Sequence, residues 1–168
     1  MIKLVILDVD GTLTDGKLYI DNLGNEMKAF DVKDGLAISQ AIKQGLIFAI
    51  ITGKISKIVE RRGTELGIQE IIQGSFNKIK DLETILNKYS ISLEETCYIG
   101  DDLIDLKPMK LCGFSACPKD SVPEILEISD YISTKNGGCG AVREILEKIL
   151  KDMGLWEKIV SNITGGVQ

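Results

Sequence analysis

The residues best suited to chemistry in this sequence are aspartates that follow apolar runs, because the chain contains no histidine. Asp8 and Asp10 come directly after the apolar run at 4–7. A second acidic group follows the run at 97–99: Asp101, Asp102 and, one helical turn on, Asp105. Side chains two apart on an extended chain point the same way, so Asp8 and Asp10 can face one site. Adding Asp101 would crowd three carboxylates, which requires a cation, and oxygen-only donors favour Mg²⁺ before Ca²⁺.

Two more features stand at comparable places in the chain. Thr52 and Gly53 follow the apolar run at 46–51, and Lys78 opens a predicted helix. Taken singly, the Thr-Gly pair suits a turn, the later acids suit a helix cap, and the lysine suits a solvated surface. Taken together, three strand ends converge on acids and a threonine, at the edge where open parallel sheets bind ligands. Lys78 then offers a counter-charge for a phosphate or a carboxylate.

The elements that must position these residues alternate in type. Strands are predicted at 2–7, 46–52, 70–74, 97–102, 113–117 and 130–133. Helices are predicted at 33–45, 56–67, 77–89, 122–128 and 139–154, with a capped turn at 92–95. The stretches 17–20 and 26–31 flank a turn and predict a β-hairpin, whereas the tail from about residue 153 to 168 has mixed character. The alternation predicts a three-layer α/β fold around a parallel sheet.

Length and charge limit the classes of protein that fit. The chain of 168 residues suits one domain, residues 1–168, with one sizeable core. A net charge of −5 argues against a nucleic-acid partner. No apolar run reaches the length of a membrane span, so no membrane partner is expected. The N-terminal run could pass for a short signal peptide but lacks a small-residue cleavage site, so we interpret it as a first strand and expect a cytoplasmic protein. Four cysteines form no C-x-x-C pair and are expected to be small buried residues in a reducing compartment: Cys97, Cys112, Cys117 and Cys139.

Four motifs occur in order between residues 8 and 105: DVDGTLTDG, ITG, Lys78 and GDDLID. They resemble the signature motifs of the haloacid dehalogenase (HAD) superfamily of phosphatases, which implies a Rossmann-like HAD fold. The resemblance implies that Asp8 is the nucleophile, a role that suits a carboxylate already ionised at neutral pH. It implies that Asp10 is the general acid and then the general base, and that Lys78 balances charge in the transition state. Two groups would grip the phosphoryl oxygens: Thr52 and the amide of Gly53.

The same resemblance implies a metal site. Mg²⁺ would be held by Asp8, by the backbone carbonyl of Asp10 and by Asp101, with Asp102 and Asp105 supporting from nearby. The ion would let one anion attack another by neutralising the charge between them. The second carboxylate of the first motif favours a phosphatase over a dehalogenase.

The gaps between the motifs leave no room for the cap domain that many members of the superfamily carry. An uncovered site would be wet and unselective, so we expect a neighbouring subunit to close it. This capless layout resembles the 3-deoxy-D-manno-octulosonate 8-phosphate (KDO 8-phosphate) phosphatases over nearly the whole chain, in DGKLYIDNLGNEMKAFDVKDGLAI, QGSFNK, GDDLIDLKPMK and NGGCGAVRE. The resemblance implies a homotetramer with the hairpins at the interface. The end of the tail, 165–168, would reach a neighbour's site or would simply be a frayed terminus.

One position departs from the pattern of that family. Octulosonate phosphatases have arginine after the second motif, where this chain has Lys54, and relatives acting on the nine-carbon 2-keto-3-deoxynononate (KDN) 9-phosphate commonly have an acid. Lysine keeps the positive charge but loses the bidentate fork that suits a carboxylate. The eight-carbon sugar-acid phosphate stays favoured, with the nine-carbon one as the alternative. Arg61 or Arg62 could hold the substrate carboxylate or lie on a solvated helix face, and 137–140 could line the substrate or simply start the last helix.

Two other functions fit the same fold. A binding module without turnover would lack Asp8 or Asp10, and both are present. A phosphotransferase or phosphomutase would need a cover that excludes water, which the short gaps do not supply.

Overall fold

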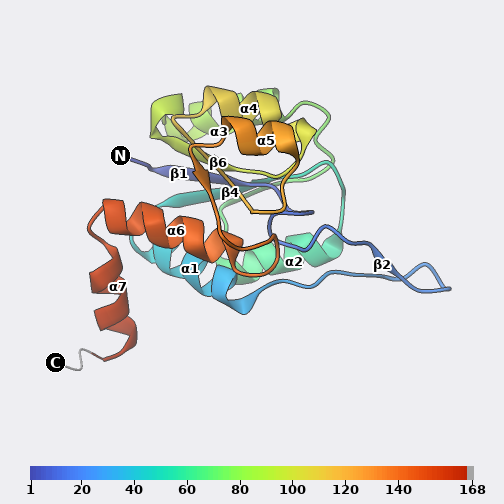
Figure 1. Cartoon of the computed structure of the whole chain (residues 1–168), viewed down its shortest axis with the longest axis horizontal. Coiled ribbons are helices and arrows are strands. Elements are labelled where there is room, and N and C mark those ends of the chain that lie inside the picture. Colours follow the sequence, from blue (N-terminus) through green and yellow to red (C-terminus); the bar gives the residue numbers. More distant parts are fainter. Residues whose placement is uncertain (166–168) are drawn as a thin grey trace.

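Six parallel strands form one sheet in the structure, a computed structural model that describes residues 1–165. The strands lie in the order β5-β4-β1-β6-β7-β8, and every neighbouring pair is parallel (Figure 1). Their bounds are β1 (Leu4–Leu7), β4 (Ile47–Ile51), β5 (Glu70–Ile72), β6 (Thr96–Ile99), β7 (Phe114–Cys117) and β8 (Tyr131–Ile132). The predicted parallel α/β fold is confirmed, and each strand is slightly shorter than predicted.

The first strand lies in the middle of the sheet, between β4 and β6. Leu7, the last residue of β1, is level with Ile50 of β4 and with Ile99 of β6. The segments that follow these three strands therefore emerge side by side at one edge of the sheet.

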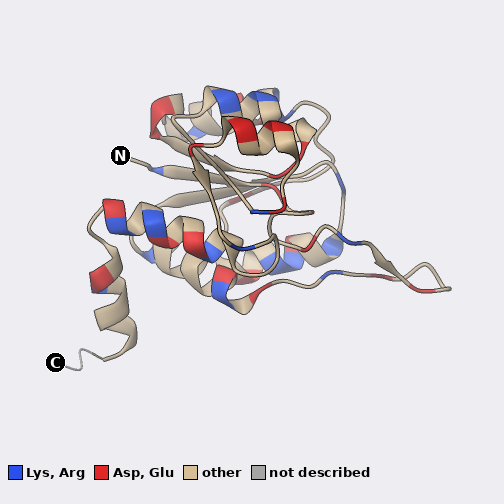
Figure 2. Ribbon diagram, in the orientation of Figure 1, with Lys and Arg blue, Asp and Glu red and all other residues tan. Residues whose placement is uncertain are grey.

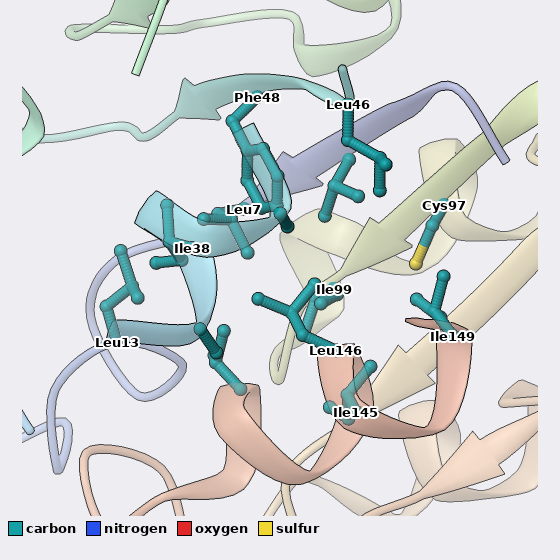
Figure 3. Close-up of a cluster of buried hydrophobic side chains, with 14 of the residues drawn as sticks. Leu7, Leu13, Ile38, Leu46, Phe48, Cys97, Ile99, Ile145, Leu146 and Ile149 are labelled. Atoms are coloured by element: carbon teal, nitrogen blue, oxygen red, sulfur yellow. The ribbon is translucent and has the colours of Figure 1, made fainter. Parts of the chain in front are cut away.

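Helices cover both faces of the sheet, with α1, α2 and α6 on one face and α3, α4 and α5 on the other (Figure 1). Their bounds are α1 (Val32–Lys43), α2 (Lys57–Leu66), α3 (Lys78–Tyr89), α4 (Leu106–Leu111), α5 (Pro123–Ile128), α6 (Ala141–Asp152) and α7 (Trp156–Ile163), with short 3₁₀ turns η1 (Leu93–Glu95) and η2 (Leu103–Asp105). Alternate residues of β1 join different cores: Val5 and Leu7 pack toward α1 and α6, whereas Leu4 and Ile6 pack toward α3. Figure 3 shows the first of these cores between β1, β4, β6 and the two helices.

The predicted helix ends match the observed ones at several places. Ser56 caps α2, because its side chain accepts a hydrogen bond from the Ile58 amide. Gly67 ends that helix in the left-handed region, with φ 80°. The capping box between Ser92 and Glu95 is also present, at the start of η1.

Two helices were not predicted. Half of the tail is helical: α7 occupies 156–163, and its apolar residues recur at helical spacing at 156, 159, 160 and 163. The other helix, α4, follows the acidic motif directly. Pro108 lies in its first turn, where a missing backbone amide costs little.

The predicted hairpin is present, but its two strands are shorter than the predicted arms. β2 (Tyr19–Ile20) pairs antiparallel with β3 (Glu26–Met27), and the hairpin projects from the body of the molecule (Figure 1). Its apolar side chains are exposed: Leu18, Ile20, Leu23 and Met27. Between β1 and α3 the described chain holds only this hairpin, α1, β4, α2 and β5, so no cap domain is inserted between the motifs.

The charged residues of the helices, the absence of a membrane-spanning helix from the described residues and the burial of the cysteines can be compared with the sequence. Acidic and basic residues are interspersed along α6, whereas α5 carries acidic residues alone (Figure 2). Within residues 1–165 no helix is long and apolar enough to cross a membrane. All four cysteines are free. Cys97 and Cys117 are buried as expected and Cys112 is half-buried, but Cys139 is exposed, so the expectation of burial was wrong for Cys139.

Candidate active site

The segment after β1 turns sharply and folds back toward β6. The Val9 carbonyl accepts hydrogen bonds from three successive backbone amides, those of Thr12, Leu13 and Thr14. Gly11 has φ +91°, and a Cβ there would lie 2.0 Å from an Asp101 oxygen, so only glycine allows this turn. The Thr12 hydroxyl donates to Asp101 Oδ1 at 2.9 Å, which ties the first acidic motif to the last.

Lys78 lies at the centre of the site. Its Nζ is 2.8 Å from Asp8 Oδ1 and 2.7 Å from Asp105 Oδ1, and the three side chains are at most 5% exposed. Lys78 is the first residue of α3, so the N-terminus of this helix carries the cation to the end of β1. A lysine gains nothing from the dipole at a helix N-terminus. The two carboxylates therefore supply the stabilisation of this buried charge.

The carboxylates of this cluster outnumber its cation. Burial, reinforced by the nearby Asp105 charge, raises the pKa of Asp8, even though Lys78 opposes the shift. Burial, reinforced by the charge of Asp8, raises the pKa of Asp101 to about 8. Burial also acts to lower the pKa of Lys78, but Asp8 and Asp105 outweigh it and raise that pKa. The site thus binds protons strongly unless another positive charge enters it.

The donor atoms of this cluster fit a hard divalent cation. Asp8, Asp101 and Asp105 each offer a carboxylate oxygen, and these oxygens lie within 4.8 Å of one another. Carboxylate oxygens alone, without sulfur or imidazole, are the donors that Mg²⁺ prefers. The negative charge of Asp8 contributes to the raised pKa of Asp101, and such an ion would neutralise that charge.

Asp105 is held in place by the protein rather than left free for a ligand. Its Oδ1 accepts the Lys78 ammonium and, at 3.0 Å, the buried hydroxyl of Tyr98. Its Oδ2 accepts the Asp101 amide at 3.3 Å. Gly100 makes room for this carboxylate, because a Cβ there would lie 2.5 Å from its carbon. Asp105 therefore supports the cluster, which leaves Asp8 and Asp101 with oxygens free for an ion.

The remaining predicted residues lie around this cluster or away from it. Thr52 is buried at the end of β4, and Gly53 and Lys54 are exposed beyond it. Asp102 is exposed, and its side chain caps η2 by accepting from the Leu103 amide at 2.7 Å. An open hollow of about 550 Å³ adjoins Gly53 and Lys78, between α3 and α4.

The two arginines of α2 do not reach the carboxylate cluster of their own chain. Arg61 is 82% exposed and pairs with Glu65 at 3.0 Å. Arg62 lies between α1 and α2, where its guanidinium approaches Gly35. Neither arginine is therefore placed against the carboxylates of the cluster.

The glycines of the NGGCG segment rest on the first motif. A Cβ on Gly137 would lie 1.9 Å from the Gly11 carbonyl oxygen, and the Gly138 amide donates to the Thr12 carbonyl at 3.2 Å. Asp120 fixes this segment by accepting from the Gly137 amide at 2.9 Å. The segment supports the backbone of the site and also starts the last helix, as one alternative predicted, because Gly140 is the N-cap of α6.

Two polar residues at the site were missed in the sequence. Tyr98 lies in an apolar strand, and the only feature of the sequence that could have marked it as a site residue is its hydroxyl, two residues before Gly100. Lys28 lies just after β3, and its ammonium pairs with the Asp10 carboxylate. Its signal is the alternation of Glu26 and Lys28, which puts both side chains on one side of the strand.

Comparison with known proteins agrees with this geometry. Residues 47–146 match the family model for haloacid dehalogenase-like hydrolases, and the fold and the acidic cluster define the same class. The chain is 43% identical to the 3-deoxy-D-manno-octulosonate 8-phosphate phosphatase KdsC of Escherichia coli K12, over 91% of this chain and 81% of that protein. The protein belongs to the family of KDO 8-phosphate phosphatases.

Solved structures extend the similarity to three dimensions. The phosphatase of this family from Moraxella catarrhalis, crystallised with magnesium, phosphate and KDO, has a TM-score of 0.94 and 44% identity, covering 96% of this chain and 93% of its own. A probable YrbI family phosphatase from Pseudomonas syringae has a TM-score of 0.95 and 38% identity, covering 97% and 93%. The predicted family and fold are confirmed.

Proposed function

We propose that this protein hydrolyses KDO 8-phosphate to KDO and inorganic phosphate. The observation that carries the proposal is the cluster of buried Asp8 and Lys78 with half-buried Asp101 at the carboxyl ends of β1 and β6, in a chain of the KDO 8-phosphate phosphatase family. The Moraxella relative binds both products of this reaction together with magnesium. This combination favours a phosphatase over a binding module.

In the first half of the reaction, a carboxylate oxygen of Asp8 attacks the phosphorus atom of the substrate. The bond from phosphorus to the sugar oxygen breaks, and its electron pair leaves with that oxygen. Asp10 donates a proton to the departing oxygen, so the sugar acid leaves as an alcohol. Lys78, bonded to Asp8, holds the nucleophile in place and balances negative charge as it develops.

In the second half, Asp10 accepts a proton from water while the water oxygen attacks phosphorus. The bond between phosphorus and the Asp8 oxygen breaks, which frees phosphate and restores the Asp8 carboxylate. Asp8, Asp101 and the Asp10 backbone carbonyl would hold Mg²⁺. When bound, the ion supplies a positive charge between the attacking carboxylate and the phosphoryl group.

The residues at 52–54, which follow β4, are proposed to recognise the substrate. Thr52 and the Gly53 amide bind phosphoryl oxygens, and the exposed Lys54 offers a positive charge to the sugar-acid carboxylate. Arg61, whose guanidinium is paired with Glu65 in the structure, is the other candidate for this charge. Lys54 leaves the nine-carbon KDN 9-phosphate as the alternative substrate, since neither an arginine nor an acid stands there.

We also propose that the protein is a homotetramer whose hairpins form the interface. The exposed apolar side chains of the hairpin support this, because Leu23 is 88% and Met27 67% exposed. The tail predicted to enter a neighbour's site ends in residues 166–168, which lie outside the described residues. The free cysteines suit the cytoplasm, where we place the protein.

The test is phosphate release from a panel of sugar-acid phosphates, with KDO 8-phosphate and KDN 9-phosphate compared at equal concentration. The proposal expects the highest kcat/KM for KDO 8-phosphate, loss of turnover in EDTA and recovery with Mg²⁺. Preference for the nine-carbon ester would move the assignment to the alternative. Light scattering on the same preparation should give the mass of a tetramer, and an active monomer would contradict the proposed assembly.

A further inference from the structure

Lys28 is a buried cation on an otherwise exposed hairpin. Its side chain is 2% exposed, whereas the preceding Met27 is 67% exposed. The two side chains point to opposite sides because they are neighbours on an extended chain. Lys28 therefore turns back toward the body of the protein, and its ammonium pairs there with the carboxylate of Asp10.

Glu26 completes this arrangement. Its Oε1 lies 3.4 Å from Lys28 Nζ, on the same side of the hairpin. That oxygen is buried and has no hydrogen-bond partner among the described residues, so Lys28 is its nearby compensating charge. Ion pairs from Glu26 to Lys28 and from Lys28 to Asp10 thus connect the hairpin to the segment that follows β1.

The carboxylate of Asp10 is separate from the acidic cluster at which phosphoryl transfer is proposed. The grouped carboxylates are Asp8, Asp101 and Asp105, and Asp10 is not among them. Asp10 is instead held from the hairpin side by Lys28. A carboxylate with no such partner would sample several rotamers, and each misplaced rotamer removes the proton donor from the leaving oxygen.

We propose that Lys28 is a positioning residue for proton transfer, which orients the Asp10 carboxylate toward the leaving oxygen of the substrate. The inference rests on the proposed phosphatase function. It makes the hairpin part of the chemistry of its own subunit, in addition to its proposed place in the interface. Lys28 acts through Asp10 and transfers no proton itself.

The leaving group provides the test. The alkoxide of KDO 8-phosphate must be protonated as it departs, whereas p-nitrophenolate leaves p-nitrophenyl phosphate without a proton. The value of kcat/KM covers only the steps up to leaving-group departure, so it excludes the hydrolysis of the phosphorylated enzyme. General acid catalysis contributes about 10²–10⁴-fold, so Lys28→Met should lower kcat/KM for KDO 8-phosphate by about 10–100-fold. For p-nitrophenyl phosphate the loss should stay within about threefold.

A double-mutant cycle separates this role from direct binding. Asp10→Asn should show the same dependence on the leaving group, and Lys28→Met should add little to it in the double variant, because its effect passes through Asp10. Lys28→Arg should recover most of the activity, since it keeps the charge. Lys33→Met is the matched control, an exposed lysine just beyond the hairpin, and should behave as wild type.

Each alternative gives a different result. Equal losses on both esters, with an altered mass or melting temperature, would show that Lys28 only anchors the hairpin. Additive losses in the double variant would show that Lys28 binds substrate directly. Either result overturns the inference while leaving the phosphatase function in place. A wild-type protein that hydrolyses neither ester would overturn both, and Lys28→Gln replaces the methionine variant if that one fails to fold.

Discussion

Lys78 and Asp8 stand 70 positions apart in the chain and form a buried ion pair with a distance of 2.8 Å. The pair exists because α3 begins at Lys78, directly beside the end of the strand that carries Asp8. It aligns the proposed nucleophile before any substrate arrives. The same lysine also bonds Asp105, so one cation organises two motifs.

Asp8→Asn should abolish phosphate release, with a loss of at least about 10³-fold, because an amide cannot form the phosphorylated intermediate. The Oδ1 of asparagine can still accept the Lys78 ammonium, so the fold should be kept. Phosphate release with any monoester checks the prediction, and unfolding by denaturant checks the fold. Turnover within about tenfold of wild type would contradict the assignment of the nucleophile.

Asp101→Asn should raise the Mg²⁺ concentration needed for half-maximal activity by about 10–100-fold, because it removes a charged donor from the ion. Asp102→Asn is the matched control: its side chain is exposed and caps only η2. The measurement is a magnesium titration of activity, together with the shift in melting temperature that Mg²⁺ causes. An equal rise in the Mg²⁺ requirement for both variants would argue against Asp101 as a ligand of the ion.

Tyr98→Phe should lower the free energy of unfolding by about 1–2 kcal/mol, because a buried carboxylate loses one of its donors. The hydroxyl of Tyr98 donates to Asp105 Oδ1 at 3.0 Å, and no other change in shape accompanies the substitution. Equilibrium unfolding in urea measures the effect. Tyr131→Phe, on the edge strand β8, should cost less than about 0.5 kcal/mol, and a similar cost for both would refute a special role for Tyr98.

Asp34 should make the stability of the protein depend on pH. Burial raises its pKa from 3.8 to about 6, and its Oδ1 accepts the Arg143 amide at 2.7 Å. The folded state therefore keeps a proton that the unfolded state has already lost, so this group reduces stability as pH rises from about 4 to about 6. Asp34→Asn removes the titration, and its stability relative to wild type should rise over that range by at most about 3 kcal/mol.

Urea unfolding of both proteins at pH 4, 5, 6 and 7 measures this difference. The exposed Asp102→Asn variant should follow the wild-type curve. A stability difference between Asp34→Asn and wild type that stays constant over the range would contradict the raised pKa.

The sequence was sufficient for the fold where local signals and packing agreed. The apolar strand 4–7, the Ser56 cap and the Gly67 stop each predicted the observed element, because each depends on residues close in the chain. The acidic cluster could also be predicted, since strand ends in a parallel sheet share one edge. Helix α7 was missed although its apolar residues recur at helical spacing.

What could not be predicted depends on contacts between distant residues. Nothing local to Lys28 indicates that its ammonium reaches Asp10, and nothing local to Tyr98 indicates a bond to Asp105. Such pairings follow from the tertiary structure as a whole.

The contact between Gly137 and Gly11 has a consequence for protein synthesis. All four motifs have left the ribosome once residue 105 has emerged, yet the backbone that carries Asp10 still lacks the segment on which it rests. Catalytic competence should therefore appear late, after Gly137 and the helix behind it have been released. A nascent chain stalled before Gly137 would hold every proposed catalytic side chain and still be silent in a phosphate-release assay, whereas the released and assembled full chain would be active.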